Sequence, residues 1–99
     1  MAMVETFEDM FSWKKARILN KLIYQESNKA EFQKDFALKD QIRKSSISIM
    51  SNIAEGFERI SKKEFKYFLN VAKGSAGELR SQLYIASDLD YMANEKFKE

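Results

Sequence analysis

The chain has 99 residues, of which 44% are hydrophobic and 32% charged, with no proline and only three glycines, a composition typical of one small domain rich in helix. It contains neither cysteine nor histidine, which excludes disulfides, zinc sites built on those residues and imidazole catalysis, so we expect no metal and no cofactor. The formal net charge of +2 is too small to indicate nucleic-acid binding by itself, so only the distribution of the charges is informative.

Hydrophobic spacing predicts a first helix over about residues 6–27. Thr6 is a suitable N-cap, and Glu8 and Asp9 follow in the first turn, where the helix dipole favours anions. One side of this helix carries the apolar residues Phe7, Phe11, Ile18 and Leu22. The segment 28–36 is polar and aperiodic, and we interpret it as a loop.

A second helix is predicted over about residues 38–58. A 4,3,4,3 spacing connects Ile42, Ser46, Ile49, Ile53 and Gly56. An adjoining stripe consists of Ile47, Met50, Ala54 and Phe57, so the apolar face is wide. Small serine side chains lie among the isoleucines, which permits close approach of a neighbouring helix.

The third predicted helix, over about residues 62–92, has the clearest start. Ser61 and Glu64 form an S-x-x-E capping signature. The same 4,3,4,3 spacing then connects Phe65, Leu69, Ala72, Ala76, Leu79, Leu83 and Ala86. A second apolar strip lies nearly opposite and contains Tyr67, Val71, Ile85, Leu89 and Met92. A helix that is apolar on two sides must be covered on both, by a fourth helix or by another subunit.

These elements predict an all-α fold, an antiparallel up-down bundle of the four-helix type that forms one domain over residues 1–99. Asn94 is a suitable N-cap, so a fourth helix is expected to start at 94–99 and to be truncated in this chain.

Basic residues gather in three places. Five of them fall within a sector of roughly 60° around the third helix: Arg59, Lys62, Lys66, Lys73 and Arg80. Shorter groups lie on the first two helices: Lys14, Arg17, Lys21, Arg43 and Lys44. For a monomer, a solvated helix face is the simpler interpretation. In a ring each group would repeat about the axis and concentrate a positive field, which favours phosphate binding, so both interpretations stay open.

The segment Asn52-Ile53-Ala54-Glu55-Gly56 places an amide and a carboxylate three residues apart near a helix end. It resembles a binding site, but we favour a structural role. Asn52 and Glu55 are expected to bond backbone groups at the helix end, and Gly56 to supply a positive φ there.

Two glycines and a serine, Gly74, Ser75 and Gly77, stand in the middle of the third helix. Each glycine costs about 1 kcal/mol relative to alanine. Since no strand precedes them, a phosphate-binding loop is excluded. We expect close approach of another helix, either within the bundle or across subunits.

The motifs of the second and third helices resemble those of a known family. The matching positions are Gln41, Arg43, Lys44, Ser48, Ile49, Asn52 to Gly56, Ser61, Glu64, Phe65, Phe68, Leu69, Ala72, Gly74, Ser75, Glu78 and Leu79. The pattern is similar to that of the four-helix-bundle proteins encoded in intervening sequences of bacterial 23S ribosomal RNA, also described as ribosomal-protein-like. It also resembles the accessory variability determinant of diversity-generating retroelements, which shares this fold.

This resemblance, which spans about residues 7–92, implies closed ring homo-oligomers, typically pentamers, and no enzymatic activity. For the retroelement relatives it implies binding to nucleic acid and to a reverse transcriptase; for the ribosomal-RNA-encoded members it implies no defined biochemical role. The chain departs from the pattern at Phe32-Gln33, where Phe-Pro is usual, and in the missing remainder of the fourth helix.

We therefore expect a non-catalytic oligomer that binds RNA or DNA through its basic groups. The alternatives are a protein-interaction scaffold, for example for a reverse transcriptase, and a truncated relic without function. No apolar run approaches the roughly 20 residues needed to span a bilayer. Residues 1–9 carry three acids and no base, unlike a signal peptide, so a cytoplasmic protein without a membrane partner is expected.

Overall fold

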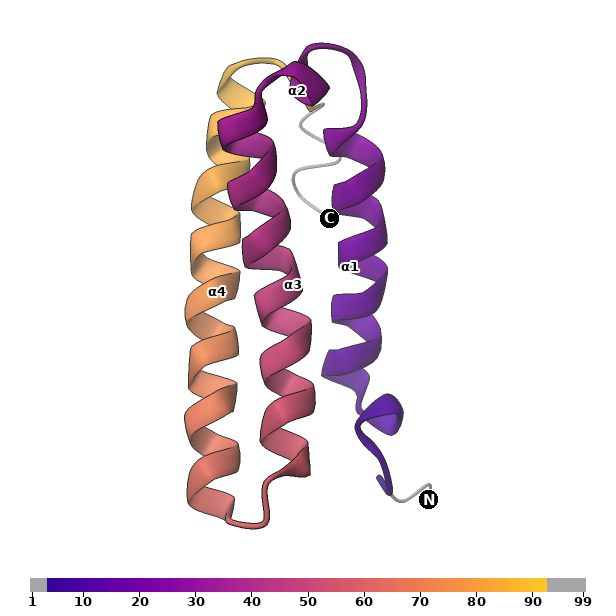
Figure 1. Cartoon of the computed structure of the whole chain (residues 1–99), viewed down its shortest axis with the longest axis vertical. Coiled ribbons are helices and arrows are strands. Elements are labelled where there is room, and N and C mark those ends of the chain that lie inside the picture. The colour runs from indigo at the N-terminus through magenta and orange to yellow at the C-terminus, as the bar shows by residue number, and fades with distance from the viewer. Residues whose placement is uncertain (1–3, 93–99) are drawn as a thin grey trace.

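Three long helices make up most of the molecule in the computed structural model, which describes residues 4–92. They are α1 (Phe11–Ser27), α3 (Phe36–Glu58) and α4 (Lys62–Asp88), accompanied by a short 3-10 turn, η1 (Phe7–Asp9), and a short helix, α2 (Ala30–Lys34). The long helices lie side by side and successive ones run in opposite directions (Figure 1). The described residues contain no strand, which confirms the all-α class.

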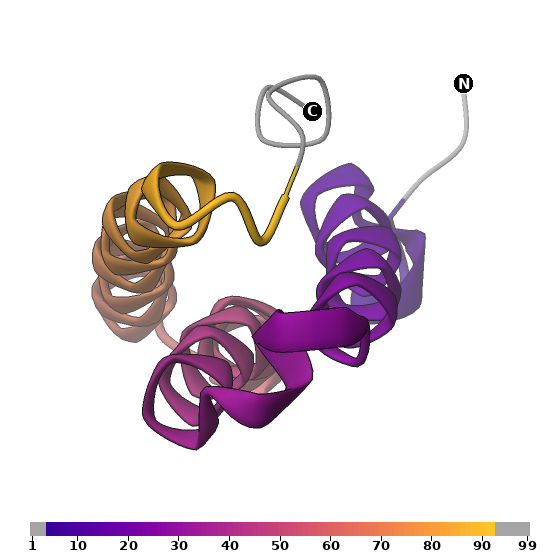
Figure 2. The same ribbon diagram turned by 90° about the horizontal axis from the view of Figure 1, so that it is seen from above.

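The central helix of the three is α3, which packs against both α1 and α4. Seen along the helix axes, the three form an arc that is open between α1 and α4 (Figure 2). The core lies inside this arc and consists mainly of the predicted apolar positions: Ala16, Ile23, Ile42, Ile49, Ile53, Ala72, Leu79, Leu83 and Ala86. The helical spacing of the sequence therefore identifies the packed faces of α3 and α4 correctly. The predicted apolar side of α1 is wrong, because Phe11 and Ile18 on it are 74% and 66% exposed, and Ala16 and Ile23 are buried instead.

The predicted start of the first helix at residue 6 is wrong. The carboxylate of Asp9 accepts hydrogen bonds from the backbone N–H groups of Glu5 and Thr6, both at 3.2 Å, and η1 ends there. Met10 is extended, with φ −72° and ψ 129°, so α1 begins only at Phe11. A local side-chain hydrogen bond thus competes with the first helical turn.

The predicted loop over 28–36 is also wrong, since it contains α2 and the start of α3. Phe32 in α2 is only 1% exposed and belongs to the core. A helix of five residues is too short to show a period in the sequence. The side chain of Asp35 accepts the N–H of Leu38 at 3.1 Å and caps α3 two residues earlier than predicted.

The last helix ends at Asp88, before the predicted residue 92. Asp90 adopts a positive φ of 60°, and the N–H groups of Asp90 and Tyr91 donate to the carbonyls of Ser87 (3.0 Å) and Ala86 (2.8 Å). This is a Schellman ending with aspartate where glycine is usual. The expected start of a fourth helix at 94–99 lies outside the described residues.

The segment after α4 packs against the α2–α3 junction. The ring of Tyr91 stacks on that of Phe32, with 5.1 Å between centroids, and its hydroxyl donates to Asp35 at 3.1 Å. Met92 is buried in the core. The 89–92 strap therefore ties the end of α4 to the start of α3.

Gly56 does not have the positive φ that we predicted. It lies within α3 and is buried, and a Cβ atom added there would stand 2.9 Å from Cβ of Phe68 on α4. The requirement at this position is therefore close approach of two helices. The helix ends two residues later, at Glu58.

Candidate nucleic-acid interface

One side of α4 carries a row of cations that form no ion pair within the described part of the chain. Four of the predicted residues, Lys62, Lys66, Lys73 and Arg80, are exposed, and none of the ion pairs found among residues 4–92 includes them. From Lys62 to Arg80 the row extends about 27 Å along the helix axis. We call these four residues the α4 row.

Arg59 does not join this row, although the sequence places it in the same sector. Its guanidinium forms an ion pair with Glu55 one turn earlier and lies over the ring of Phe68, 4.9 Å from its centroid. Arg59 is therefore compensated, and with Glu55 it stabilises the turn between α3 and α4. Its charge is less available to a ligand than that of the α4 row.

The amide of Asn52 does not bond groups at the helix end, as we had expected. It donates to the carbonyl of Ser48 at 2.8 Å and to its hydroxyl at 3.0 Å, and that hydroxyl lies 2.7 Å from the hydroxyl of Ser75 on α4. Ser45 extends this polar contact by donating to Gln82 at 2.9 Å. The serines of α3 thus hydrogen-bond across the contact with α4.

The remaining residues of the predicted structural motif lie along α4. Ser61 accepts the N–H of Glu64 at 3.1 Å and caps the helix. Glu78 is exposed. Gly74 is also exposed, and a Cβ atom added there, or at Gly77, would meet nothing within 4 Å. Close approach within the described chain therefore does not explain these two glycines.

The basic group of α1 faces solvent. Lys14, Arg17 and Lys21 are exposed and surround the exposed Ile18, and together they line an open hollow of about 410 Å³. Arg17 also lies near the ring of Trp13, at 5.9 Å from its centroid. Three cations at helical spacing around a hollow can hold an anion, but with little shape selectivity.

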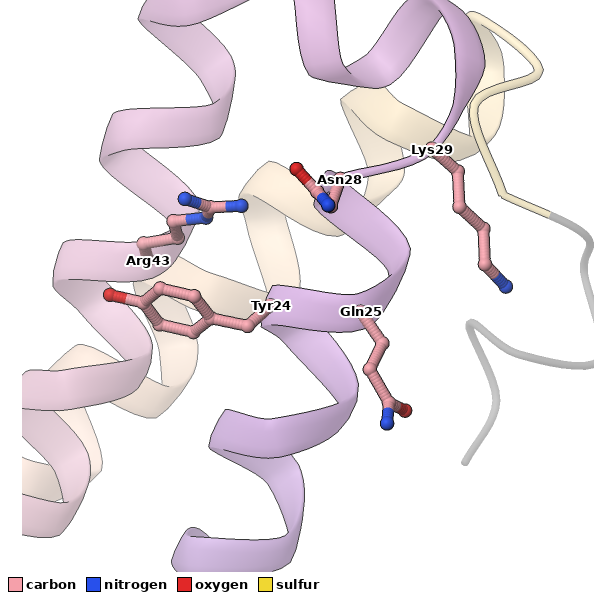
Figure 3. Close-up of a pocket in the computed structure, with 5 residues that line it drawn as sticks. All are labelled: Tyr24, Gln25, Asn28, Lys29 and Arg43. Atoms are coloured by element: carbon pink, nitrogen blue, oxygen red, sulfur yellow. The ribbon is translucent and has the colours of Figure 1, made fainter.

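Arg43 and Lys44 are neighbours in sequence but have different environments. Lys44 is exposed, whereas Arg43 is half-buried. The Nε of Arg43 donates to the Ser27 hydroxyl at 2.9 Å, and the guanidinium lies 4.3 Å from the ring centre of Tyr24 (Figure 3). Arg43 therefore joins α3 to α1, a role that the sequence did not reveal.

The predicted cations do not form one continuous patch. The α1 group and the α4 row are carried by helices that both pack on α3 and stand apart from each other across the open side of the arc (Figure 2). Within one described chain, the cations of each group therefore lie close to one another, but the two groups do not meet.

Sequence reasoning missed an apolar groove on the open side of the arc. It has a volume of about 430 Å³ and is lined by Phe11, Ser12, Lys15, Ala16, Leu19, Ile49, Ile53 and Ala76. Phe11 on its rim is 74% exposed. The sequence placed Phe11 on one apolar side of the first helix but did not show that this side chain is exposed.

Among residues 4–92, two ionisable side chains have perturbed pKa values, and neither belongs to the basic clusters described above. Hydrogen bonds from the backbone N–H groups of Glu5 and Thr6 lower the pKa of Asp9. The pKa of Tyr91 is raised mainly by desolvation and, to a smaller extent, by the hydrogen bond to Asp35. The described residues include no cluster of acidic side chains suited to a metal ion, and none of their helices is long and apolar enough to cross a bilayer.

Comparison with known proteins identifies one family. No curated protein matches this sequence. The family model described as "23S rRNA-intervening sequence protein" matches residues 8–99, which is nearly the whole chain. The match includes both motifs on which the resemblance rests, at residues 41–56 and 61–79. The chain therefore belongs to the 23S rRNA-intervening sequence protein family.

Proposed function

We propose that this protein is a non-catalytic, cytoplasmic homo-oligomer that binds RNA or DNA through phosphate groups. The observation that carries the proposal is the α4 row, four exposed cations with no acidic partner among the described residues. Uncompensated cations in a row attract a polyanion and gain from the release of its counterions.

The side chains of the α4 row are suited to binding phosphate groups. Lysine ammonium groups recognise charge and carry no information on base identity. The α4 row and the basic group of α1 lie on the surface of a helical arc, and no helix of the described residues is arranged as in the known groove-reading motifs. We therefore expect weak sequence preference and strong salt dependence.

Self-association would multiply these contacts. The outer side of α4 exposes Tyr67, Ile85 and Leu89, at 61%, 47% and 51% of their surface, next to Gly74 and Gly77. A second copy packed there would bury the apolar strip and explain the two glycines. A ring, with five copies as the resemblance implies, would repeat the α4 row around its axis.

The groove on the open side of the arc supports a second candidate function, that of a protein-interaction scaffold. Its floor, formed by Ile49 and Ile53, and its wall at Leu19 have the apolar character of a helix-binding site. In the four-helix arrangement that we propose, this is the position of the fourth helix. A helix from a partner, such as a reverse transcriptase, would occupy the same place.

Matched charge reversals test the nucleic-acid proposal. In K66E/K73E two members of the α4 row are reversed, while K34E/K63E makes the same change in net charge at exposed lysines outside it. We expect the first variant to lose binding of a labelled RNA oligonucleotide and the second to retain most of it, with both equally helical by circular dichroism. Equal binding by the two variants would overturn the proposal.

A further inference from the structure

The junction between the end of α1 and the first half of α3 holds an arginine that is fixed in place. Two contacts orient Arg43: its Nε donates to the hydroxyl of Ser27 at 2.9 Å, and its guanidinium carbon lies 4.3 Å from the ring centre of Tyr24. Ser27 is fully buried, so this anchor belongs to the core. A ligand that binds Arg43 would lose little side-chain entropy.

Within residues 4–92, this arginine has no acidic partner. The ion pairs among residues 4–92 connect Lys29 with Glu26, Lys34 with Glu31 and Arg59 with Glu55, and none includes Arg43. Arg59 shows the contrast, since it is more exposed and yet is compensated. Because Arg43 is half-buried, its charge is less screened by water, and an anion that reaches it gains more than at an exposed lysine.

A cavity of about 640 Å³ that is open to solvent lies beside this arginine, lined by Tyr24, Gln25, Asn28, Lys29 and Arg43. In Figure 3 the Asn28 side chain extends toward the guanidinium, whereas Gln25 and Lys29 point away from it. Nε is already used, so the two terminal nitrogens of Arg43 remain as a pair of donors. The Asn28 amide adds another donor near the same space.

We propose that this cavity is a phosphate subsite, in which the terminal nitrogens of Arg43 hold two phosphate oxygens and the Asn28 amide a third. The planar guanidinium matches two oxygens of one phosphate, which the lysines of the α4 row do not. The C-terminal end of α1 carries a partial negative charge from the helix dipole, which repels an anion. The backbone N–H groups of Asn28 and Lys29 already reduce this partial charge by donating to the last carbonyls of the helix. The full charge of Arg43 outweighs it.

This inference rests on the proposed function for its ligand class, because the phosphate can come from a free nucleotide or from a nucleic-acid backbone. The direct test is a nuclear magnetic resonance titration of the wild-type protein with inorganic phosphate, a mononucleotide and an RNA oligonucleotide, each against chloride at equal ionic strength. We expect saturable shifts of the Arg43 Nε–H and Asn28 amide signals with all three phosphates. Shifts that chloride reproduces, or no shifts, would overturn the subsite.

The arms of the titration also separate the sources of the phosphate. If the mononucleotide and the oligonucleotide reach half of the maximal shift at similar concentrations, the ligand of the subsite is a free nucleotide. If the oligonucleotide reaches half of the maximal shift at a much lower concentration, the ligand of the subsite is the nucleic-acid backbone. Both results support the subsite, because each requires a phosphate bound at Arg43.

Variants provide an independent test. R43K retains the charge but loses the paired donors, and we expect oligonucleotide affinity to fall about tenfold. K34Q, which removes an exposed charge at the same end of the molecule, should leave it unchanged. Thermal unfolding establishes that R43K is folded, and wild-type affinity in folded R43K would contradict the subsite.

The two proposals fail in different ways. If K66E/K73E loses the oligonucleotide while phosphate still shifts the Arg43 signal, both proposals stand. If the wild-type protein binds the oligonucleotide without affecting Arg43, the subsite is wrong and the proposed function stands. If phosphate shifts Arg43 but no oligonucleotide binds, the nucleic-acid proposal is wrong.

Discussion

Gly56 shows at the scale of one residue how tightly α3 and α4 pack. An added methyl group would stand 2.9 Å from Cβ of Phe68 and 3.3 Å from the Phe65 carbonyl oxygen. We expect G56A to lower the free energy of unfolding by about 1–3 kcal/mol, because the clash outweighs the gain in helix propensity. Urea unfolding measures this.

Gly74 provides the matched control for that substitution. The space around it is open within the described chain, so G74A in a monomer should gain up to about 1 kcal/mol. If G56A and G74A have the same effect on stability, the close contact between α3 and α4 is not the reason that position 56 requires glycine.

Among the residues that the structure describes, the buried hydroxyl of Ser46 finds no hydrogen-bond partner. Removing it in S46A should leave stability unchanged or raise it by about 1 kcal/mol, since an unsatisfied polar group is lost. S75A should instead lower stability by about 1 kcal/mol, because it leaves the Ser48 hydroxyl without its partner across the helix contact. Thermal unfolding of both variants gives the comparison, and a clear loss in S46A would show that its hydroxyl is satisfied.

Among the elements, the 89–92 strap predicts a dependence on pH. Desolvation and the hydrogen bond to Asp35 raise the pKa of Tyr91 in the folded state, so its contribution is present below the unfolded pKa of about 10. It is lost as the pH rises through the folded pKa, because the tyrosinate no longer donates and repels Asp35. The urea midpoint of the wild type should thus fall more than that of Y91F above pH 10. Parallel curves would contradict this.

The elements that the sequence predicted are those governed by long periodic patterns or strong caps. Spacing over several turns identified the buried faces of α3 and α4, and Ser61 marked the start of α4. The errors have local causes: the Asp9 side chain interrupts the first turn, Phe32 is buried from a five-residue helix, and Asp90 ends α4 without glycine. None of these leaves a periodic signal.

Periodic patterns in the sequence predicted only part of the candidate site. Spacing located the α4 row, because residues on one helix face share a sector. It did not show that Arg59 pairs with Glu55, nor that Arg43 contacts Tyr24 and Ser27. The position of Arg43 depends on how α1 packs against α3, and that contact joins residues far apart in the chain.

For the whole molecule, the exposed strip of α4 predicts self-association. Ile85 is 47% exposed on a face that also carries Tyr67 and Leu89. I85E should dissociate the oligomer, because a charge would be buried in an apolar contact. Q33E, which adds the same single negative charge at an exposed position elsewhere, should not. Sedimentation equilibrium measures the mass, and a wild-type protein that is monomeric at all concentrations would contradict the ring.

The salt dependence of binding tests most directly whether the α4 row recognises phosphate. Fluorescence anisotropy would compare the affinity of the wild-type protein for a labelled single-stranded RNA at about 50 and 200 mM salt. Four phosphate contacts predict a loss of roughly 50-fold over this range. No binding at the lower salt concentration by a helical sample, or an affinity that does not change with salt, would show that the α4 row does not recognise phosphate.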